Sequence, residues 1–241
     1  MNKSIEKMMG DLRGIAIRVG PMVAMRWGLA LILKLPSIIR TRNLQAADLL
    51  MGVGPFHVFY TSSVDFSILG NGAFSGIREM YVRDTYLHGG ALAIEDGDVV
   101  VDLGANMGNF SNLALAHGQN VRVVAVEPNR DLNEVWKSSL GLNDGFLERA
   151  ILVSGFIGMK GALQDQLMQD DRYREADWLS EEEFIDIAKL TKIDFLKCDI
   201  EGAEYGLLRP GGMLLNMVRK IAVEIHAFAG DVGGFQDMLR S

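Results

Sequence analysis

The strongest constraint on the fold is the regular alternation of strand and helix signals from residue 98 onward. Short apolar runs, typical of strands buried on both faces, lie at 99–103, 121–126, 146–153, 193–200 and 221–225. Helices are expected between them, because Asn129 is a capping residue and Ser180 forms a capping box with Glu183. This alternation predicts a parallel sheet with right-handed crossovers, which is a doubly wound α/β domain.

The part of the chain before this domain has a different pattern. Residues 22–34 are strongly apolar and predict a helix. Residues 56–69 are rich in β-branched and aromatic side chains and precede a turn signal at 70–72, which predicts a small β-hairpin. We therefore predict an N-terminal helical and hairpin extension over residues 1–92 and the α/β domain over residues 93–241.

The charge of the chain limits its partners. Its net charge is −7, so most of its surface repels a phosphate backbone, and nucleic acid is not an expected partner. Residues 1–42 hold eight basic and two acidic residues, a net +6, which leaves −13 for the rest of the chain. The single cysteine, Cys198, lies in an apolar run and cannot form an internal disulfide, which favours a reducing cytoplasm.

Two interpretations stay open for the basic residues 1–42. Arg18, Arg26 and Lys34 interrupt the apolar segment, so no uncharged window is long enough to cross a bilayer, and no small-residue cleavage site of a signal peptide follows. The segment is either a basic amphipathic helix at the anionic inner face of a membrane, or a helix that packs on its own domain or on a dimer mate. The sequence leaves the oligomeric state open.

The stretch Val99–Gly108, VVVDLGANMG, joins the first strand of the domain to a glycine turn. Gly104 and Gly108 would let the backbone approach a ligand, and the following helix offers amide donors. The spacing G-x-x-x-G differs from the dinucleotide fingerprint G-x-G-x-x-G. Asp102 would repel a pyrophosphate but attract a sulfonium, and Glu127, at the next strand end, can accept ribose hydroxyls. These features favour S-adenosylmethionine over NAD.

Four segments, VVVDLGANMGNFSNLA, VVAVEPN, IDFLKCDIEGAEYGLL and IAVEIH, resemble the FkbM family of S-adenosylmethionine-dependent methyltransferases. The resemblance spans about residues 78–226, and the pairing of D-x-G-A-N-x-G with D-x-E-G-A-E makes it specific. It implies a Rossmann-like class I methyltransferase fold and methyl transfer to a hydroxyl of a sugar, polyketide or related small molecule. By motif position it implies these cofactor-binding residues: Asp102, Gly104, Asn106, Gly108, Glu127 and Asp199.

The C-terminal part departs from this class of fold. Such domains usually add an antiparallel strand pair after the fifth strand, but only residues 227–241 follow it here. We therefore expect the pair to be missing or truncated. Because this pair often helps to shape the acceptor pocket, the sequence does not identify the walls of that pocket. Residues 155–177 also contain no recognisable adenine-binding motif.

Chemistry is expected at the ends of the fourth and fifth strands. Transfer to a hydroxyl requires alignment of the acceptor and removal of its proton. His226 is the leading candidate for the base, because histidine ordinarily titrates near neutral pH, and Asp199 and Glu201 are further catalytic candidates. Glu201 and Glu204 have a second interpretation as caps of the next helix. Such a cluster could also bind a divalent metal ion, but we predict a metal-free site.

Three functions remain compatible with these patterns. The leading one is an S-adenosylmethionine-dependent O-methyltransferase. The second is a non-catalytic module or membrane-associated relative that binds the cofactor but lacks a complete acceptor pocket. The third is an NAD-dependent oxidoreductase, which the glycine spacing does not support.

Overall fold

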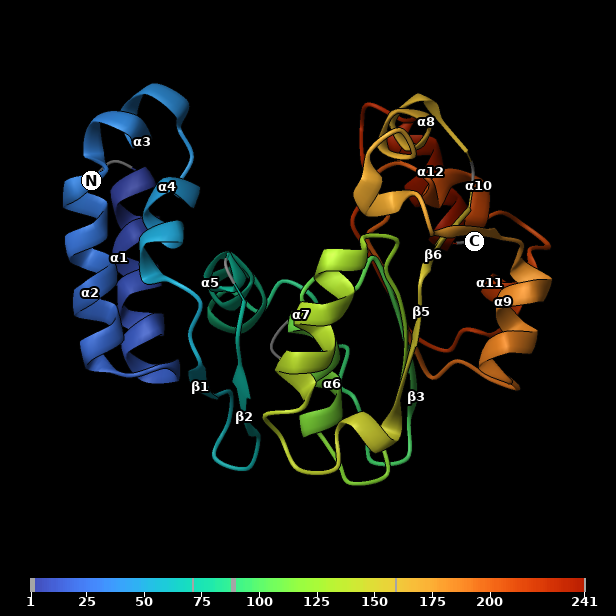
Figure 1. The fold of residues 1–241 in the computed structure, drawn as a ribbon, viewed down its shortest axis with the longest axis horizontal. Coiled ribbons are helices and arrows are strands. Elements are labelled where there is room, and N and C mark those ends of the chain that lie inside the picture. Colours follow the sequence, from blue (N-terminus) through green and yellow to red (C-terminus); the bar gives the residue numbers. More distant parts are fainter. Residues whose placement is uncertain (1–2, 71, 88–89, 159, 241) are drawn as a thin grey trace.

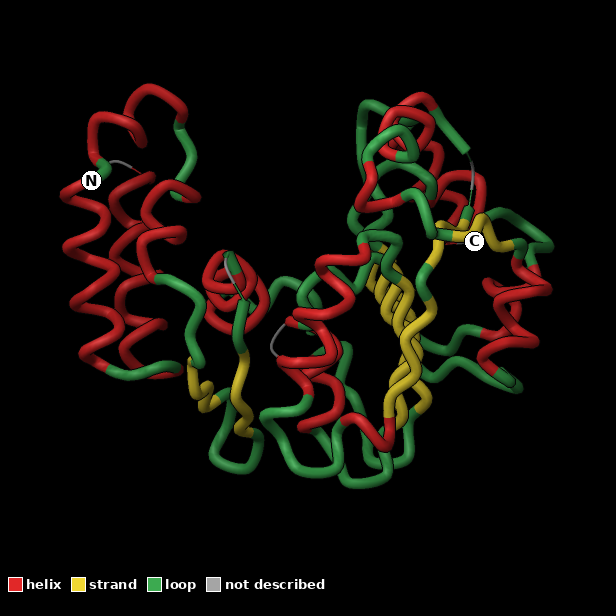
Figure 2. The backbone as a smooth tube through the Cα atoms, in the orientation of Figure 1, coloured by secondary structure: helices red, strands yellow, loops and turns green. Residues whose placement is uncertain are grey.

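The computed structural model describes residues 3–70, 72–87, 90–158 and 160–240 and confirms the predicted α/β fold. Its centre is a parallel five-stranded sheet in the order β5-β4-β3-β8-β9, shown as yellow strands in Figure 2. These strands are β3 (Val99–Leu103), β4 (Arg122–Val126), β5 (Ala150–Val153), β8 (Phe195–Cys198) and β9 (Ile221–Val223). The strand order reverses between β3 and β8, and ligands of doubly wound sheets bind beyond such a reversal.

Helices cover both faces of this sheet, so each strand buries both of its side-chain rows. On one face lie α6 (Asn109–Ala116) and α7 (Arg130–Leu140), and on the other lie α9 (Glu181–Ala188) and α11 (Met213–Met217), as Figure 1 shows. The alternation along β3 explains the two cores, because Val100 packs into one and its neighbour Val101 into the other. Complete burial of each such side chain contributes about 1.5–3 kcal/mol.

The predicted helix starts are confirmed. Asn129 Oδ1 accepts hydrogen bonds from the amides of Asp131 and Leu132, and α7 begins directly after it. Ser180 and Glu183 form the predicted capping box at the start of α9. The remaining elements after β4 are η4 (Leu147–Arg149), β6 (Gly155–Ile157), α8 (Ala162–Leu167), η5 (Asp171–Tyr173), β7 (Asp177–Leu179), α10 (Glu204–Leu207) and α12 (Val232–Arg240).

Two details of this domain differ from the sequence prediction or extend it. The third strand is shorter than predicted, because its first half forms the 3₁₀ turn η4. The strands β6 and β7 form a separate parallel pair that the sequence did not reveal, since three-residue strands are too short to show a period. After β9, the described residues up to 240 contain α12 and no strand.

The N-terminal part contains the predicted helix and hairpin. Its elements are α1 (Lys3–Arg18), α2 (Pro21–Leu33), α3 (Leu35–Thr41), α4 (Gln45–Asp48), η1 (Leu49–Met51), β1 (Phe56–Phe59), β2 (Asp65–Ile68), α5 (Ala73–Gly76) and the π-helical turn η2 (Ile77–Val82). The hairpin β1–β2 turns within residues 60–64, not at the glycine signal 70–72, of which Asn71 lies outside the described residues. Thr61 Oγ1 accepts from the amide of Ser63 and stabilises that turn.

A buried polar network ties the N-terminal helices to the rest of the molecule. Arg78 of η2 pairs with Asp48 at 2.8 Å and lies 3.6 Å from Asp11 of α1. Trp27 of α2 donates to the same Asp48 carboxylate at 2.8 Å. One apolar core extends from Ile15 and Trp27 to β3, so the predicted boundary at residue 92 does not separate two cores.

No single helix among the described residues is long and apolar enough to span a membrane. The consecutive helices α2 and α3, bent by 70° relative to each other, meet the length and composition criteria only as a pair.

Candidate active site

The glycine turn after β3 is fixed by a contact between two strand ends. Gly104, Asn106 and Gly108 have positive φ angles of 74°, 50° and 85°. A Cβ atom at Gly104 would overlap the backbone carbonyl oxygen of Asp199, which follows β8. A Cβ atom at Gly108 would lie 3.0 Å from the ring of Trp136. Both glycines therefore allow close packing within the protein. The sequence had instead suggested that they let a ligand approach the backbone.

Every amide from Gly104 to Gly108 already has an acceptor inside the protein. The acceptors, in order along the turn, are Val126 O twice, Glu127 Oε2, Asn106 Oδ1 and Ala105 O. A pyrophosphate in a dinucleotide-binding turn requires such amides to be free. The turn is therefore a poor site for NAD, for a reason that the glycine spacing alone did not supply.

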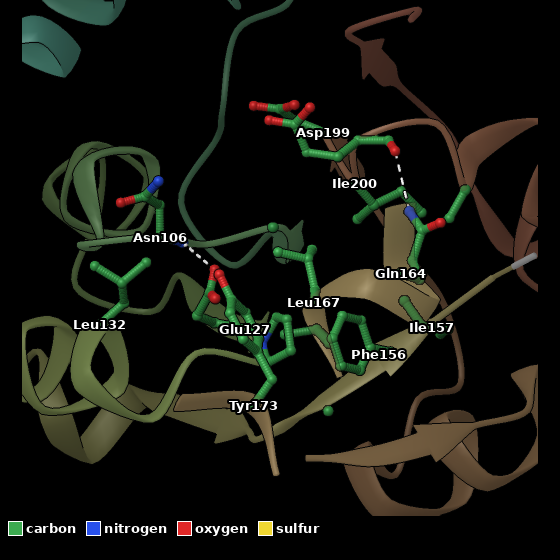
Figure 3. A pocket seen from close by; sticks show the side chains of 16 residues that line it. Asn106, Glu127, Leu132, Phe156, Ile157, Gln164, Leu167, Tyr173, Asp199 and Ile200 are labelled. Atoms are coloured by element: carbon green, nitrogen blue, oxygen red, sulfur yellow. Dashed lines mark hydrogen bonds between the residues drawn. The ribbon is translucent and has the colours of Figure 1, made fainter. Parts of the chain in front are cut away.

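Glu127 lies at the end of β4 and lines a first cavity of about 180 Å³ (Figure 3). Its carboxylate accepts from the amides of Asn106 at 2.9 Å and Asn129 at 2.8 Å, one on each oxygen. Each oxygen keeps a lone pair for a hydroxyl donor in the cavity. Burial raises the pKa of Glu127, and the two amide donors oppose that shift.

The other walls of the first cavity are mostly apolar. Leu132, Phe156, Leu167 and Tyr173 line it, and the ring of Phe156 stacks on that of Tyr173 at 5.8 Å between centroids (Figure 3). Such walls suit a flat heteroaromatic ring. The sequence did not predict these residues, because they come from separate short elements without a shared spacing.

A buried ion pair lies beneath the glycine turn. Lys197 Nζ is 3.3 Å from Asp102 Oδ1 and 3.8 Å from Asp199 Oδ2, and it donates to the carbonyl of Gly104 at 2.7 Å. Asp102 also accepts a 2.7 Å hydrogen bond from the hydroxyl of Ser111. Burial alone would lower the pKa of Lys197, but the two carboxylates outweigh burial and raise it, so the side chain is an ammonium ion.

This ion pair changes the role of Asp102, which was expected from the sequence to attract the sulfonium of the ligand. The side chain of Asp102 is completely buried and lines neither of the cavities described here, and Lys197 compensates its charge. Asp102 therefore holds the turn in place from behind. Asp199, unlike Asp102, is a strand-end carboxylate that a ligand can contact, because it lines both the first cavity and a second one.

The second cavity, of about 810 Å³, lies on the other side of Asp199 between η2, β9 and the glycine turn. Glu224 and Tyr86 line it, and the Tyr86 hydroxyl is 3.4 Å from both Asp199 Oδ2 and Glu224 Oε2. Burial, followed by the charge of Asp199, raises the pKa of Glu224. Burial also raises the pKa of Tyr86, so its hydroxyl stays protonated and donates.

The profile of the methyltransferase FkbM domain matches residues 102–241 of this sequence, which contain the end of β3, the glycine turn and every residue that lines the first cavity. Part of the second cavity, including Tyr86, lies before the matched residues. The chain belongs to the FkbM methyltransferase family. No curated protein matches the sequence. Among solved structures, it is similar to a protein from Streptococcus mutans named as an S-adenosylmethionine-dependent methyltransferase, with 14% identity and a TM-score of 0.42. That match covers 73% of this chain and 43% of the other, so the chain spans less than half of that protein.

The predicted cofactor residues of this FkbM domain do not all face a cavity. Gly104, Asn106, Glu127 and Asp199 line the first cavity, whereas Asp102 and Gly108 support the turn from behind. Glu201, a predicted catalytic residue, also lines the first cavity, and its side chain is largely exposed.

His226 of the FkbM domain lies next to Asp199 but is held from behind by Glu204. Its Nδ1 is 3.1 Å from the completely buried Glu204 carboxylate, and its Nε2 is 3.4 Å from Glu201 and 3.8 Å from Asp199. Glu204 also accepts from the amide of Gly202 at 2.8 Å, but it is the first residue of α10 and Gly202 precedes the helix, so this bond does not cap the helix amides. The imidazole therefore has a fixed orientation, with one nitrogen directed at the carboxylates.

Asp199, Glu224 and His226 also form the geometry of a cation site. Each offers one ligand atom, and these atoms lie within 4.8 Å of one another. Oxygen and imidazole ligands together suit several divalent metals. The Lys197 ammonium lies 3.8 Å from Asp199 and would repel a metal ion bound by that carboxylate. The metal-free site stays a prediction.

Replacing Gly104 with alanine tests the contact between the strand ends. The left-handed backbone and the overlap with the Asp199 carbonyl together are expected to lower the free energy of unfolding in urea by about 2–4 kcal/mol. Gly145→Ala is the control, because Gly145 has a φ of 73° and nothing lies within 4 Å of its Cβ position. Equal losses in the two variants would show that backbone conformation alone, and not the contact, requires Gly104.

Proposed function

We propose that this FkbM methyltransferase transfers a methyl group to a hydroxyl oxygen of a small molecule, such as a sugar or a polyketide. The observation that carries the proposal is the position of Asp199 between two cavities. One cavity has the features of a nucleoside site, and the other contains the neighbouring carboxylates of Asp199 and Glu224, which are suited to accept a proton. Methyl transfer requires the cofactor and the acceptor to lie next to each other, and Asp199 lies where the two cavities meet.

The first cavity fits S-adenosylmethionine in its polar and apolar parts. Glu127 would accept the ribose hydroxyls, and the apolar walls around Phe156 would hold the adenine ring. Asp199, with Asn106 nearby, would face the cationic amino acid end. When bound, S-adenosylmethionine supplies an electrophilic methyl group and leaves as S-adenosylhomocysteine.

The second cavity supplies the acceptor chemistry in this proposal. Glu224 accepts the proton of the acceptor hydroxyl, so that the oxygen lone pair forms the new bond to carbon. Its raised pKa makes Glu224 a better proton acceptor than an ordinary glutamate. Tyr86 and Asp199 position the acceptor, and His226 orients Asp199 from behind, as a positioning residue rather than the base predicted from the sequence.

Methyl transfer from labelled S-adenosylmethionine to a panel of hydroxyl, amine and thiol compounds tests the proposal. We expect label on hydroxyl compounds only. Glu127→Gln is expected to weaken binding of S-adenosylmethionine by about 10–100-fold in calorimetry, because the amide loses two acceptor lone pairs and the charge. Glu134→Gln, an exposed change on α7, is the matched control and should bind like the wild type.

Three outcomes would contradict parts of the proposal. Label on amines alone would overturn the acceptor class and keep the cofactor. Tight binding without transfer to any compound would instead support a non-catalytic cofactor-binding module. Unchanged affinity in the Glu127 variant would remove the assignment of the ribose site.

A further inference from the structure

Helix α2 lies at the end of the molecule farthest from the sheet (Figure 1). It exposes an apolar face to solvent. Its exposed apolar side chains recur at helical spacing, with exposed fractions from 54% to 76%: Met22, Met25, Leu29, Ile32 and Leu33. The opposite face of the helix is already buried against the N-terminal core through Trp27 and Leu31. The exposed face therefore has no role in packing α2 on its own domain.

The apolar face continues onto α3, where Leu35 and Ile39 are also exposed. Together with the α2 side chains, they form what we call the α2–α3 surface. Contiguous apolar side chains of this size are rare on the surface of a monomer and mark a binding surface.

The charged side chains of α2, α3 and the segments that flank them are all basic, and the acidic Glu79 of η2 lies beside them only in the cavity next to Ile39 and Arg42. The sequence contains no aspartate or glutamate from residue 12 to residue 47, but six basic residues. Within the described part of the chain, no carboxylate lies within ion-pair distance of Arg26, Lys34 or Arg40. The remainder of the protein has the opposite net charge. The surface is thus complementary to a partner that is both apolar and anionic.

We propose that the α2–α3 surface docks this methyltransferase on an anionic lipid bilayer. Apolar side chains of α2 and α3 would enter the boundary between headgroups and acyl chains, and the basic side chains would contact anionic headgroups. A second copy of the chain fits less well, because a two-fold interface would bring two sets of unpaired basic residues together. The proposal does not depend on the acceptor of the methyl group.

Helix α3 of this surface borders a third cavity, which shares a wall with the acceptor cavity. Ile39 of α3 and the adjoining Arg42 line this third cavity, together with Glu79 of η2 and Arg83, which follows η2. Glu79 and Arg83 also line the second cavity. A membrane-bound state would therefore place a bilayer against α3, whose cavity shares the wall formed by Glu79 and Arg83 with the acceptor site.

Flotation of the full chain with lipid vesicles tests the proposal. We expect it to float with phosphatidylcholine vesicles that contain about 30% phosphatidylserine, and less with phosphatidylcholine alone or at high salt. The triple variant Met25→Ser, Leu29→Ser, Ile32→Ser is expected to lose about tenfold or more of this binding. These three side chains are exposed, so the folded state should persist, as circular dichroism would verify.

The matched control replaces exposed apolar residues of the methyltransferase domain with serine. These residues are Leu147, Ile187 and Met213, and their triple variant should float like the wild type. A second test keeps the apolar face and changes charge alone: Lys34→Gln with Arg40→Gln should weaken binding to the anionic vesicles several-fold.

Two results would overturn the proposal. The first is flotation that is absent, or equal in the wild type and the serine variant of α2. The second is a wild-type dimer in sedimentation that becomes a monomer in the α2 variant without any vesicle binding, which would identify a second copy as the occupant. If the triple variant did not fold, the charge variant alone would decide, because unchanged flotation of that variant would also reject the proposal.

Discussion

Glu224→Gln is expected to lower kcat by about 10²–10⁴-fold, with the affinity for S-adenosylmethionine unchanged within about twofold. The variant keeps the shape of the side chain and its hydrogen bond with the Tyr86 hydroxyl, but it removes the group that accepts the acceptor proton. Glu224 lines the second cavity only, so the binding site for the nucleoside stays intact. Single-turnover methyl transfer with a hydroxyl acceptor is the measurement.

The same variant should change the pH dependence of the reaction. Glu224 acts as a base only when ionised, so wild-type kcat falls as the pH is lowered through its pKa. Burial and the neighbouring Asp199 charge raise that pKa, so the acid limb should lie above the range of an ordinary glutamate. The limb should be absent from the residual activity of the glutamine variant.

Two further variants separate the base from its neighbours. Glu79→Gln is the matched control, because Glu79 lines the same cavity and its charge raises the pKa of Glu224 less than burial and Asp199 do, so the variant should retain most of the activity. His226→Asn should lower kcat less than Glu224→Gln and leave the acid limb in place. If instead His226→Asn removed the limb and Glu224→Gln kept it, the base would be His226, as the sequence alone suggested.

The sequence predicted the elements that local patterns encode. Apolar runs located the five strands, and the side chain of Asn129 located the start of α7, because both signals depend on neighbours in the chain. The glycine turn and Glu127 were predicted for the same reason, since strand ends in a doubly wound sheet gather at one edge. These residues meet in the structure as expected.

The role of Asp102 could not be predicted in this way. Its partner, Lys197, lies 95 residues away in the sequence and meets it only because the register of β3 and β8 pairs the two residues side by side. Register depends on how the strands pack, so a single strand pattern does not reveal it. Tyr86 and Phe156 were missed for a related reason: each reaches its cavity from a segment with no periodic pattern.

Lys197→Met is expected to lower the free energy of unfolding by about 3–5 kcal/mol, because it leaves the buried carboxylate of Asp102 without its countercharge. The carbonyl of Gly104 would lose its donor as well. Urea unfolding at neutral pH gives the loss directly. Lys192→Met is the matched control: Lys192 is exposed and pairs with Asp194 at 2.8 Å, so its loss should cost less than about 1 kcal/mol.

The pH dependence and a double variant identify the cause of that loss. Without Lys197, the folded protein should favour a protonated Asp102 more strongly than the unfolded chain does, so the deficit should shrink as the pH falls and grow as it rises. Adding Asp102→Asn, which keeps the acceptor for Ser111 but removes the charge, should recover about 1–3 kcal/mol at neutral pH. A deficit that is independent of pH and of Asp102 would mean that Lys197 acts through packing alone, and the glycine turn would then be held by its hydrogen bonds to Val126 and Glu127 rather than by the ion pair beneath it.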